Sequence, residues 1–91
     1  MQIQVTVPGL LSESVGGERH FYLQSATLAQ ALRQLSKSYP RLHAYIYDEA
    51  GKIRNHVLIY YNDQSVLWLD SLDIPLKSGD RLQIIQAVSG G

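Results

Sequence analysis

Hydrophobic and polar residues alternate at the start of the chain. Ile3, Val5 and Val7 fall on one side of an extended backbone, and the intervening Gln and Thr residues fall on the other. A period of two is typical of a strand with one buried face, so a strand is predicted over 2–8. A second alternating segment, 19–23, predicts another strand, and the Gly-containing segment between the two predicts a loop or hairpin turn.

The period changes to that of a helix after residue 27. The apolar residues that recur at helical spacing are Leu28, Ala31, Leu32, Leu35 and Tyr39. They share one face of a helix, opposite a face of Gln, Arg and Lys residues. Thr27 precedes the run and Gln30 follows three residues later, which is the spacing of a capping box. Pro40 is expected to end this amphipathic helix, which has to pack its apolar face across a sheet.

Most of the chain after residue 41 is predicted to be extended. Two β-rich runs, 42–47 and 53–61, are interpreted as a hairpin connected through 48–51. Three further elements are expected: a turn at Asn62 and Asp63, a short strand near 66–67, and a last strand over 81–87.

The order of these elements is strand, strand, helix and then three or four strands. It predicts an α+β domain in which a mixed sheet of four to five strands packs on one main helix. The β-grasp arrangement fits this order best, although the order also admits a ferredoxin-like domain that lacks one helix. Residues 1–87 are expected to form the domain, and residues 88–91 a flexible C-terminal tail that ends in Gly-Gly.

Composition excludes several classes of partner. Eight basic and eight acidic residues give a formal net charge of zero, which removes the main electrostatic reason to expect nucleic acid or an anionic membrane as a partner. No apolar run approaches the ~18 residues that span a bilayer, and the N-terminus lacks the positive region of a secretory signal. The chain has no cysteine, so a reducing cytoplasm is the expected location for so small a domain.

The sequence predicts no catalytic residue and no metal site. His20, His43 and His56 are isolated from one another, without the spacing of metal ligands. No phosphate-binding, dinucleotide-binding or nucleophile motif is present. Asp70 and Asp73 lie close together in a polar loop, where solvated carboxylates are more common than an acid–base pair.

The chain ends in Gly90 and Gly91, directly after the predicted last strand. Frayed, glycine-rich termini are common, and that is the ordinary interpretation. Residues without a Cβ also pass through narrow active-site openings, and Ala87 and Ser89 are small as well. The α-carboxylate of Gly91 is ionised near neutral pH and is a poor electrophile until it is activated. Joining it to AMP would supply that activation.

The second half of the chain resembles the ThiS/MoaD family of ubiquitin-like sulfur carriers. The matching elements are the turn at Asn62, the loop 72–76, the pair Gly79 and Asp80, the apolar strand 82–88, and Gly90 and Gly91. The first half agrees, because "SATLAQALRQLSKSYP" stands where the family has its single helix. The segment "YIYDEAGKIRNHVLIYYND" is similar to the longer branch of the family, which includes the carrier used in cysteine synthesis.

The resemblance implies a carrier protein that partner enzymes act upon. An E1-like enzyme would adenylate Gly91, and a sulfur donor, either a sulfurtransferase or sulfide, would convert it to a thiocarboxylate. An acceptor enzyme of cofactor or amino-acid biosynthesis would then take the sulfur. No cofactor is expected to be bound, since ATP and the sulfur donor are used by the activating enzyme. Three alternatives stay open: a ubiquitin-like modifier conjugated through Gly91, a small subunit of a molybdopterin-synthase-type complex, and a structural protein with an inert terminus.

The last strand also suggests where partners dock. Leu82 and Ile84 share one side of this strand and Ile85 lies on the other. If the first two face the helix, Ile85 is exposed beside the tail, unless the predicted hairpin covers it. The residues expected to contact partners are Ile85 and Ala87, Arg81 and Arg54 as rim charges, and the tail residues Val88, Ser89, Gly90 and Gly91.

Overall fold

The structure is a computed structural model that describes residues 1–86 of the chain, except for the side chain of Ser14. Its elements, in chain order, are β1 (Gln2–Thr6), the 3-10 helix η1 (Gly9–Val15), β2 (His20–Gln24), α1 (Leu28–Ser38), α2 (Pro40–Ile46), β3 (Val57–Tyr61), β4 (Gln64–Ser65), the 3-10 helix η2 (Val66–Trp68) and β5 (Arg81–Gln86). Among these residues no helix is long and apolar enough to cross a membrane.

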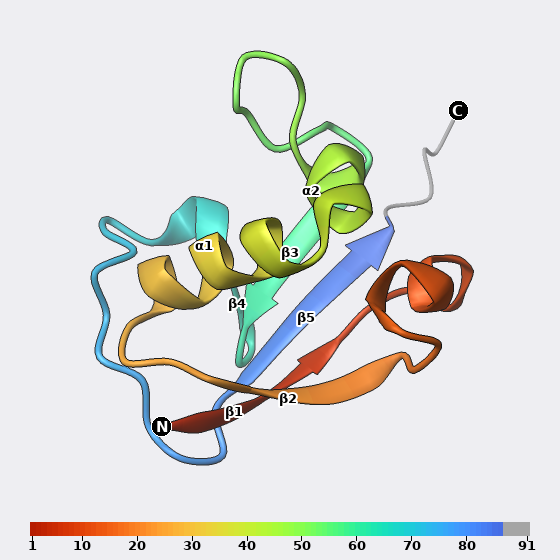
Figure 1. The fold of residues 1–91 in the computed structure, drawn as a ribbon. Coiled ribbons are helices and arrows are strands. Elements are labelled where there is room, and N and C mark those ends of the chain that lie inside the picture. Colours follow the sequence, from red (N-terminus) through yellow and green to blue (C-terminus); the bar gives the residue numbers. More distant parts are fainter. Residues whose placement is uncertain (87–91) are drawn as a thin grey trace.

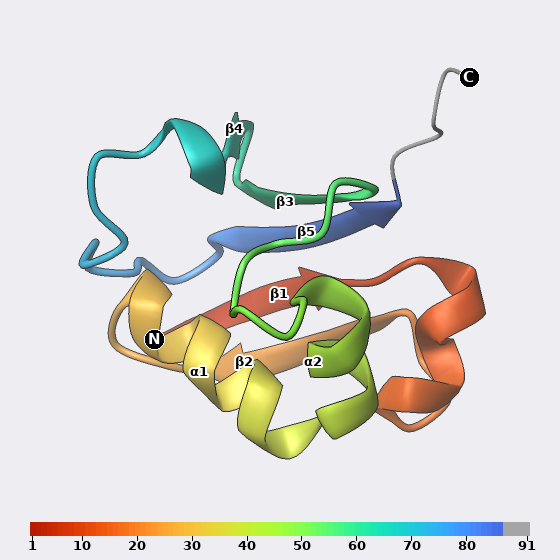
Figure 2. The same ribbon diagram turned by 90° about the horizontal axis from the view of Figure 1, so that it is seen from above.

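The five strands form one mixed sheet in the order β2-β1-β5-β3-β4 (Figure 1). β1 runs parallel to β5, and the other neighbouring strands pair antiparallel. Both α-helices lie on the same side of the sheet, as the view from above shows (Figure 2). The predicted α+β layering and strand number are confirmed, and β5, the last strand in the sequence, is the central strand of the sheet.

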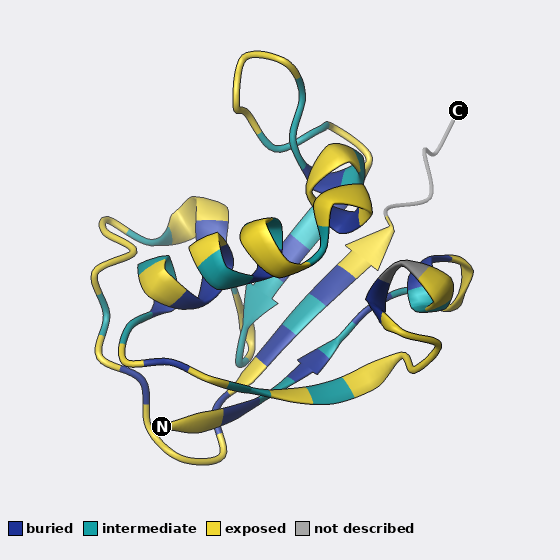
Figure 3. Ribbon diagram, in the orientation of Figure 1, coloured by how far each residue is buried: buried dark blue, intermediate teal, exposed yellow. Residues whose placement is uncertain are grey.

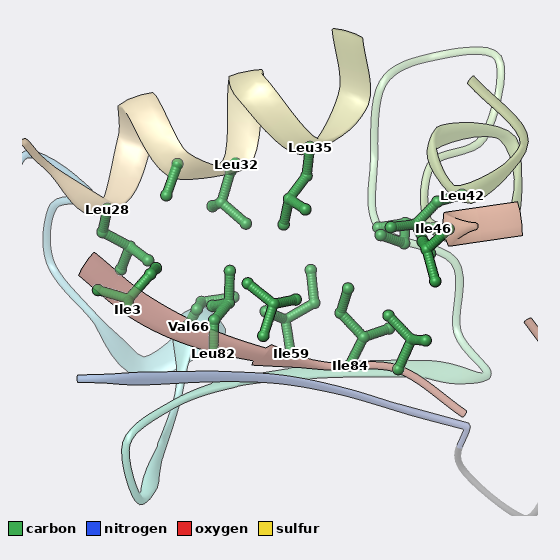
Figure 4. Close-up of a cluster of buried hydrophobic side chains, with 14 of the residues drawn as sticks. Ile3, Leu28, Leu32, Leu35, Leu42, Ile46, Ile59, Val66, Leu82 and Ile84 are labelled. Carbon is green, nitrogen blue, oxygen red and sulfur yellow. The ribbon is translucent and has the colours of Figure 1, made fainter. Parts of the chain in front are cut away.

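The core fills the space between the helices and the sheet. Leu28, Leu32 and Leu35 project from α1 toward residues such as Ile59 and Leu82 on the strands (Figure 4). These side chains are 7% exposed or less. Removing one large aliphatic side chain from water contributes about 1.5–3 kcal/mol, so the stripe of α1 is a principal source of stability.

The start of α1 forms much as its sequence predicts. The N–H of Gln30 donates to Thr27 Oγ1 at 3.2 Å, which is the first half of the predicted capping box. The side chain of Gln30 accepts from the N–H of Ala26 at 3.0 Å, one residue earlier than the box requires. The N–H groups of Leu28 and Ala29, which have no acceptor within the helix, donate to carbonyl oxygens of the loop 72–74 at 3.0 and 2.9 Å. The helix start thereby fixes that loop.

The predicted first strand of the hairpin, 42–47, is wrong. This segment is largely the second helix, α2, and only a single bridge between Tyr47 and Ile53 remains of the expected pairing. Pro40 ends α1 as predicted but also begins α2, because proline at the first helical position lacks an N–H that would have no partner there. Leu42 and Ile46 lie one helical turn apart, and both are buried against the core.

Two smaller predictions also need correction. The segment 9–17, expected to be a loop, contains η1, which buries Leu11 and Val15 and ends where Gly16 adopts a φ of 86°. The short strand expected near 66–67 is instead the pair of residues in β4, and the chain then makes one 3-10 turn, η2. The turn at Asn62 is confirmed, with a φ of 55° that asparagine tolerates.

Candidate functional site

The orientation of β5 matches the prediction. Leu82 and Ile84 are 0% and 2% exposed and face the helices, whereas Ile85 is 39% exposed on the opposite face. The end of β5 is exposed in Figure 3. Because Ile85 is exposed, the alternative in which the predicted hairpin covers it is wrong. Contact of Ile85 with a partner stays a prediction.

Ile85 belongs to a neutral patch on the helix-free side of the sheet. We define the outer sheet face as Thr6, Leu58, Tyr60, Gln83 and Ile85, which share one side because they pair across β1, β5 and β3. The first four are half-buried, and none of the five side chains is charged. A patch that contains aliphatic and aromatic side chains and no charge is typical of the core of a protein interface.

Arg81 does not lie near the C-terminal end of β5. It begins the strand, and the strand rise of about 3.3 Å per residue separates it from Gln86 by roughly 17 Å. Its guanidinium forms an ion pair with Asp63 at 3.2 Å, in which the side chains are 49% and 93% exposed. Such an exposed pair contributes little to stability. The structure therefore separates Arg81 from Ile85, with which the sequence grouped it.

Arg54 is engaged with the end of α2. Its Nε donates to the carbonyl of Ala44 at 3.1 Å, and its backbone N–H donates to the carbonyl of Ile46 at 2.8 Å. A cation that hydrogen-bonds the last carbonyls of a helix stabilises that helix terminus. The geometry gives Arg54 a structural role, and a contact with a partner stays a prediction.

A buried carboxylate, which the sequence did not predict, holds the start of β5. Asp80 is 9% exposed, and its Oδ2 accepts from the hydroxyl of Tyr61 at 2.7 Å and from the N–H of Lys77 at 2.9 Å. Its Oδ1 accepts from the side-chain amide of Asn62 at 3.4 Å. Asn62 in turn accepts from the N–H of Arg81 at 2.9 Å. We call these residues the Asp80 network.

The Asp80 network shifts the pKa values of two groups. Burial alone raises the pKa of Asp80, but the hydrogen bonds from Lys77, Tyr61 and Asn62, together with the charge of Lys77, outweigh it and lower the pKa below its ordinary 3.8. Burial, the hydrogen bond to Asp80 and the charge of Asp80 raise the pKa of Tyr61 to about 12. Asp80 is therefore ionised and Tyr61 is neutral near pH 7, so the 2.7 Å hydrogen bond keeps its donor and its acceptor.

These shifts predict a loss of stability in acid. Because the pKa of Asp80 is lower in the folded than in the unfolded chain, its contribution is complete above the unfolded value and decreases as the pH falls through the folded one. The free energy of unfolding, measured by urea denaturation between about pH 6 and pH 2, should decrease, and Asp80→Asn should make that decrease shallower. An equal pH dependence in both proteins would contradict this assignment.

The three histidines have ordinary local partners. His20 Nδ1 lies 3.1 Å from Thr6 Oγ1, and His43 Nδ1 lies 2.9 Å from Ser36 Oγ. The ring of His56 packs edge-on against Tyr45. Across residues 1–86, no three acidic or histidine side chains are placed to hold a metal ion together.

The residue expected to react, Gly91, lies beyond the described part of the chain. So do the tail residues Val88, Ser89 and Gly90 and the docking candidate Ala87. The structure places the strand that leads to them: β5 ends at Gln86, between α2 and η1 in Figure 1. Residues 87–91 follow directly from this end of the domain, where Ile85 is exposed.

Comparison with known proteins bears on both the fold and the function. The sulfur carrier protein CysO of Mycobacterium tuberculosis is 29% identical over 93 residues, covering the whole of both chains. Its crystal structure has a TM-score of 0.78 at 27% identity and covers 94% of this chain and 99% of that one. A structure of the BexX/CysO complex from Amycolatopsis orientalis has a TM-score of 0.77 at 28% identity, covering 98% and 99%.

A third relative comes from an archaeon. The small archaeal modifier protein 3 of Haloferax volcanii is 29% identical over 80 residues, which is 85% of this chain and 86% of that protein. The fold is thus the ubiquitin-like β-grasp expected from the order of elements. The model of the ThiS family matches residues 5–91, which includes the terminal glycines. The chain belongs to the ThiS family.

Proposed function

We propose that this protein carries sulfur as a thiocarboxylate on Gly91, after an E1-like enzyme has adenylated that residue. The observation that carries the proposal is the position of β5: the central strand of the sheet leads directly to residues 87–91 and presents the exposed Ile85 next to them. The family match through residue 91 and the full-length similarity to a protein named as a sulfur carrier support it. We expect the protein to act in the cytoplasm, where ATP is available.

The proposed reaction needs no catalytic side chain on the carrier. A carboxylate oxygen of Gly91 attacks the α-phosphorus of ATP and displaces pyrophosphate, which gives an acyl adenylate. Sulfide then attacks the carbonyl carbon, the bond to AMP breaks, and a thiocarboxylate remains. With sulfide as the donor, the sulfur keeps its oxidation state, and the reaction needs no oxidant or reductant. The thiocarboxylate sulfur is a nucleophile that an acceptor enzyme can use, and because the chain has no cysteine, this terminal sulfur is its one sulfur nucleophile of the thiol type.

Intact-mass spectrometry tests the proposal. The chain ending at Gly91 is incubated with the cognate E1-like enzyme, ATP and sodium sulfide. We expect an ATP-dependent mass increase that corresponds to one oxygen replaced by sulfur, and a further increase on alkylation with iodoacetamide. A variant lacking Gly91 should react far less, because its last carboxylate stops one residue short of the active site. An unchanged mass, with an enzyme that is active on a known carrier, would contradict the proposal.

The relation to a small archaeal modifier protein supports one alternative. In that case the adenylated Gly91 would be attacked by the amine of a lysine on another protein, which forms an isopeptide bond and releases AMP. Affinity-tagged protein added to extract of the source organism would then give ATP-dependent adducts of higher mass that resist reduction. Thiocarboxylate formation without such adducts would favour the carrier function alone.

A further inference from the structure

The ladder between β1 and β5 stops before β5 ends. The last registered pair of the parallel ladder is Thr6 with Gln83. On its other side, β5 stays paired with β3 up to the pair of Val57 with Gln86. Residues 84–86 of β5 are therefore paired with β3 on one side and have no paired strand on the side of β1.

The direction of the backbone groups follows from the register. The N–H of Gln4 donates to the carbonyl of Asp80 at 3.0 Å, so the backbone of residue 80 faces β1. Backbone groups alternate sides along a strand, and those of Ile84 and Gln86 therefore face β1 as well. Beyond Thr6, the carbonyl of Ile84 and the N–H of Gln86 are directed toward the position that the next residues of β1 would occupy.

Pro8 prevents β1 from reaching those groups. It is the residue in register to continue the ladder, but proline has no N–H to donate to Ile84. Its carbonyl already accepts from the N–H of Leu11 at 2.9 Å, at the start of η1. Within residues 1–86, no backbone hydrogen bond outside the regular strand pairing reaches Ile84 or Gln86. The two groups form a short open strand edge, and such edges pair readily with another chain.

A hollow of about 350 Å³ lies at this edge. Its walls are the segments 6–9 and 83–86 together with Arg19. The Nε of Arg19 donates to the carbonyl of Val7 at 3.5 Å, and no carboxylate among the described residues lies within ion-pair distance of the guanidinium. The hollow thus combines a backbone donor and acceptor at strand spacing with an unpaired positive charge.

The geometry points to an extended segment of the E1-like adenylating enzyme as the occupant of this hollow. We propose that this segment pairs with residues 84–86 as an added strand and directs a carboxylate side chain toward Arg19. The inference rests on the proposed function, since it names the partner that would take the terminus. Main-chain pairing of this kind is a recurrent mode of recognition of an extended polypeptide.

The reach of the terminus supports the choice of this partner. Five residues, 87–91, follow Gln86, and even fully extended they span at most about 17 Å. An enzyme that acts on Gly91 must therefore place its surface within that distance of the end of β5. The hollow and the outer sheet face both adjoin this end, so one enzyme surface can cover them together.

Gly9 offers a way to fill the hollow without disturbing the fold. A Cβ built on Gly9 would meet only the Arg19 side chain, at 3.7 and 3.8 Å, which is ordinary contact, and its φ is not positive. Gly9→Leu should therefore occupy the space of the added strand, whereas Gly9→Ala is the matched control. Binding of the E1-like enzyme, measured by calorimetry without ATP, should weaken about tenfold for Gly9→Leu, as for the loss of one or two hydrogen bonds, and about twofold or less for Gly9→Ala.

Two further measurements test the proposed contacts directly. The backbone amide of Gln86, followed by ¹⁵N NMR hydrogen exchange, should become protected when the enzyme binds. Arg19→Gln should weaken binding about threefold and reduce its salt dependence, because an ion pair with the enzyme is lost. Thermal unfolding of each variant verifies that it folds.

The inference and the proposed function can fail separately. Equal binding of Gly9→Leu and the natural protein, or a Gln86 amide that exchanges as fast in the complex as alone, overturns the added strand, even if the thiocarboxylate forms. Absence of the mass increase in the natural protein overturns the proposed function, while the exchange and binding data still decide whether the edge is a docking site.

Discussion

Asp80→Ala should lower the free energy of unfolding by about 3 kcal/mol. The substitution removes the acceptor of the Tyr61 hydroxyl, at 2.7 Å, and of the Lys77 N–H, at 2.9 Å, and leaves both part-buried donors without that partner. An unsatisfied buried donor costs about 1–3 kcal/mol, and the loss of the charge on Asp80 adds to this. Urea denaturation monitored by circular dichroism measures the change.

Two variants separate the contributions. Asp80→Asn keeps the volume and one acceptor oxygen and should cost less than Asp80→Ala. Tyr61→Phe removes only the hydroxyl, and a double-mutant cycle with Asp80→Asn gives the coupling energy of that hydrogen bond. A loss below about 1 kcal/mol for Asp80→Ala would show that water replaces the carboxylate, and the network would then not hold β5.

Ile85→Lys should weaken binding of the adenylating enzyme about tenfold or more. Ile85 is the exposed apolar residue on β5 next to the C-terminal end of that strand, and a lysine there would place a charge on the outer sheet face. Stability should change by less than about 1 kcal/mol, because the side chain is already partly in water. Calorimetric titration with the enzyme, alongside thermal unfolding, measures both quantities.

Leu67→Lys is the matched control. Leu67 is an aliphatic residue that is 66% exposed on η2, away from the end of β5. Its substitution introduces the same charge and should leave binding unchanged. If the two variants bind the enzyme equally well, the outer sheet face is not the docking surface.

The sequence predicted best those elements whose apolar residues recur with a single clear period. The alternation of Ile3, Val5 and Val7, and the helical recurrence from Leu28 to Leu35, each admit one type of element and one buried face. The segment 42–47 admits two types of element. Its apolar residues fit a strand with a period of two, and they also fit a helix in which Leu42 and Ile46 lie one turn apart. Tertiary packing against the core decides for the helix.

In the candidate site, too, local sequence patterns predicted some features, whereas contacts between residues distant in sequence were missed. Strand alternation predicted that Ile85 lies on the face opposite Leu82 and Ile84, but whether the predicted hairpin covers it was decided only by the structure. The Asp80 network joins residues 18 and 19 positions apart, which local patterns do not reveal. Its only signals were an asparagine in a turn and a Gly-Asp pair before the last strand. The interactions of Arg54 and Arg81 likewise depend on segments distant in sequence.

The central position of β5 has a mechanical consequence. β5 is hydrogen-bonded to β1 on one side and to β3 on the other. A force applied at the C-terminal end of β5, in the direction of the strand, acts along the strand axis. Tension in that direction loads the hydrogen bonds of the two ladders together in shear, instead of breaking them one after another. The strand pairing therefore favours resistance of the domain to a force that is applied at its C-terminal end.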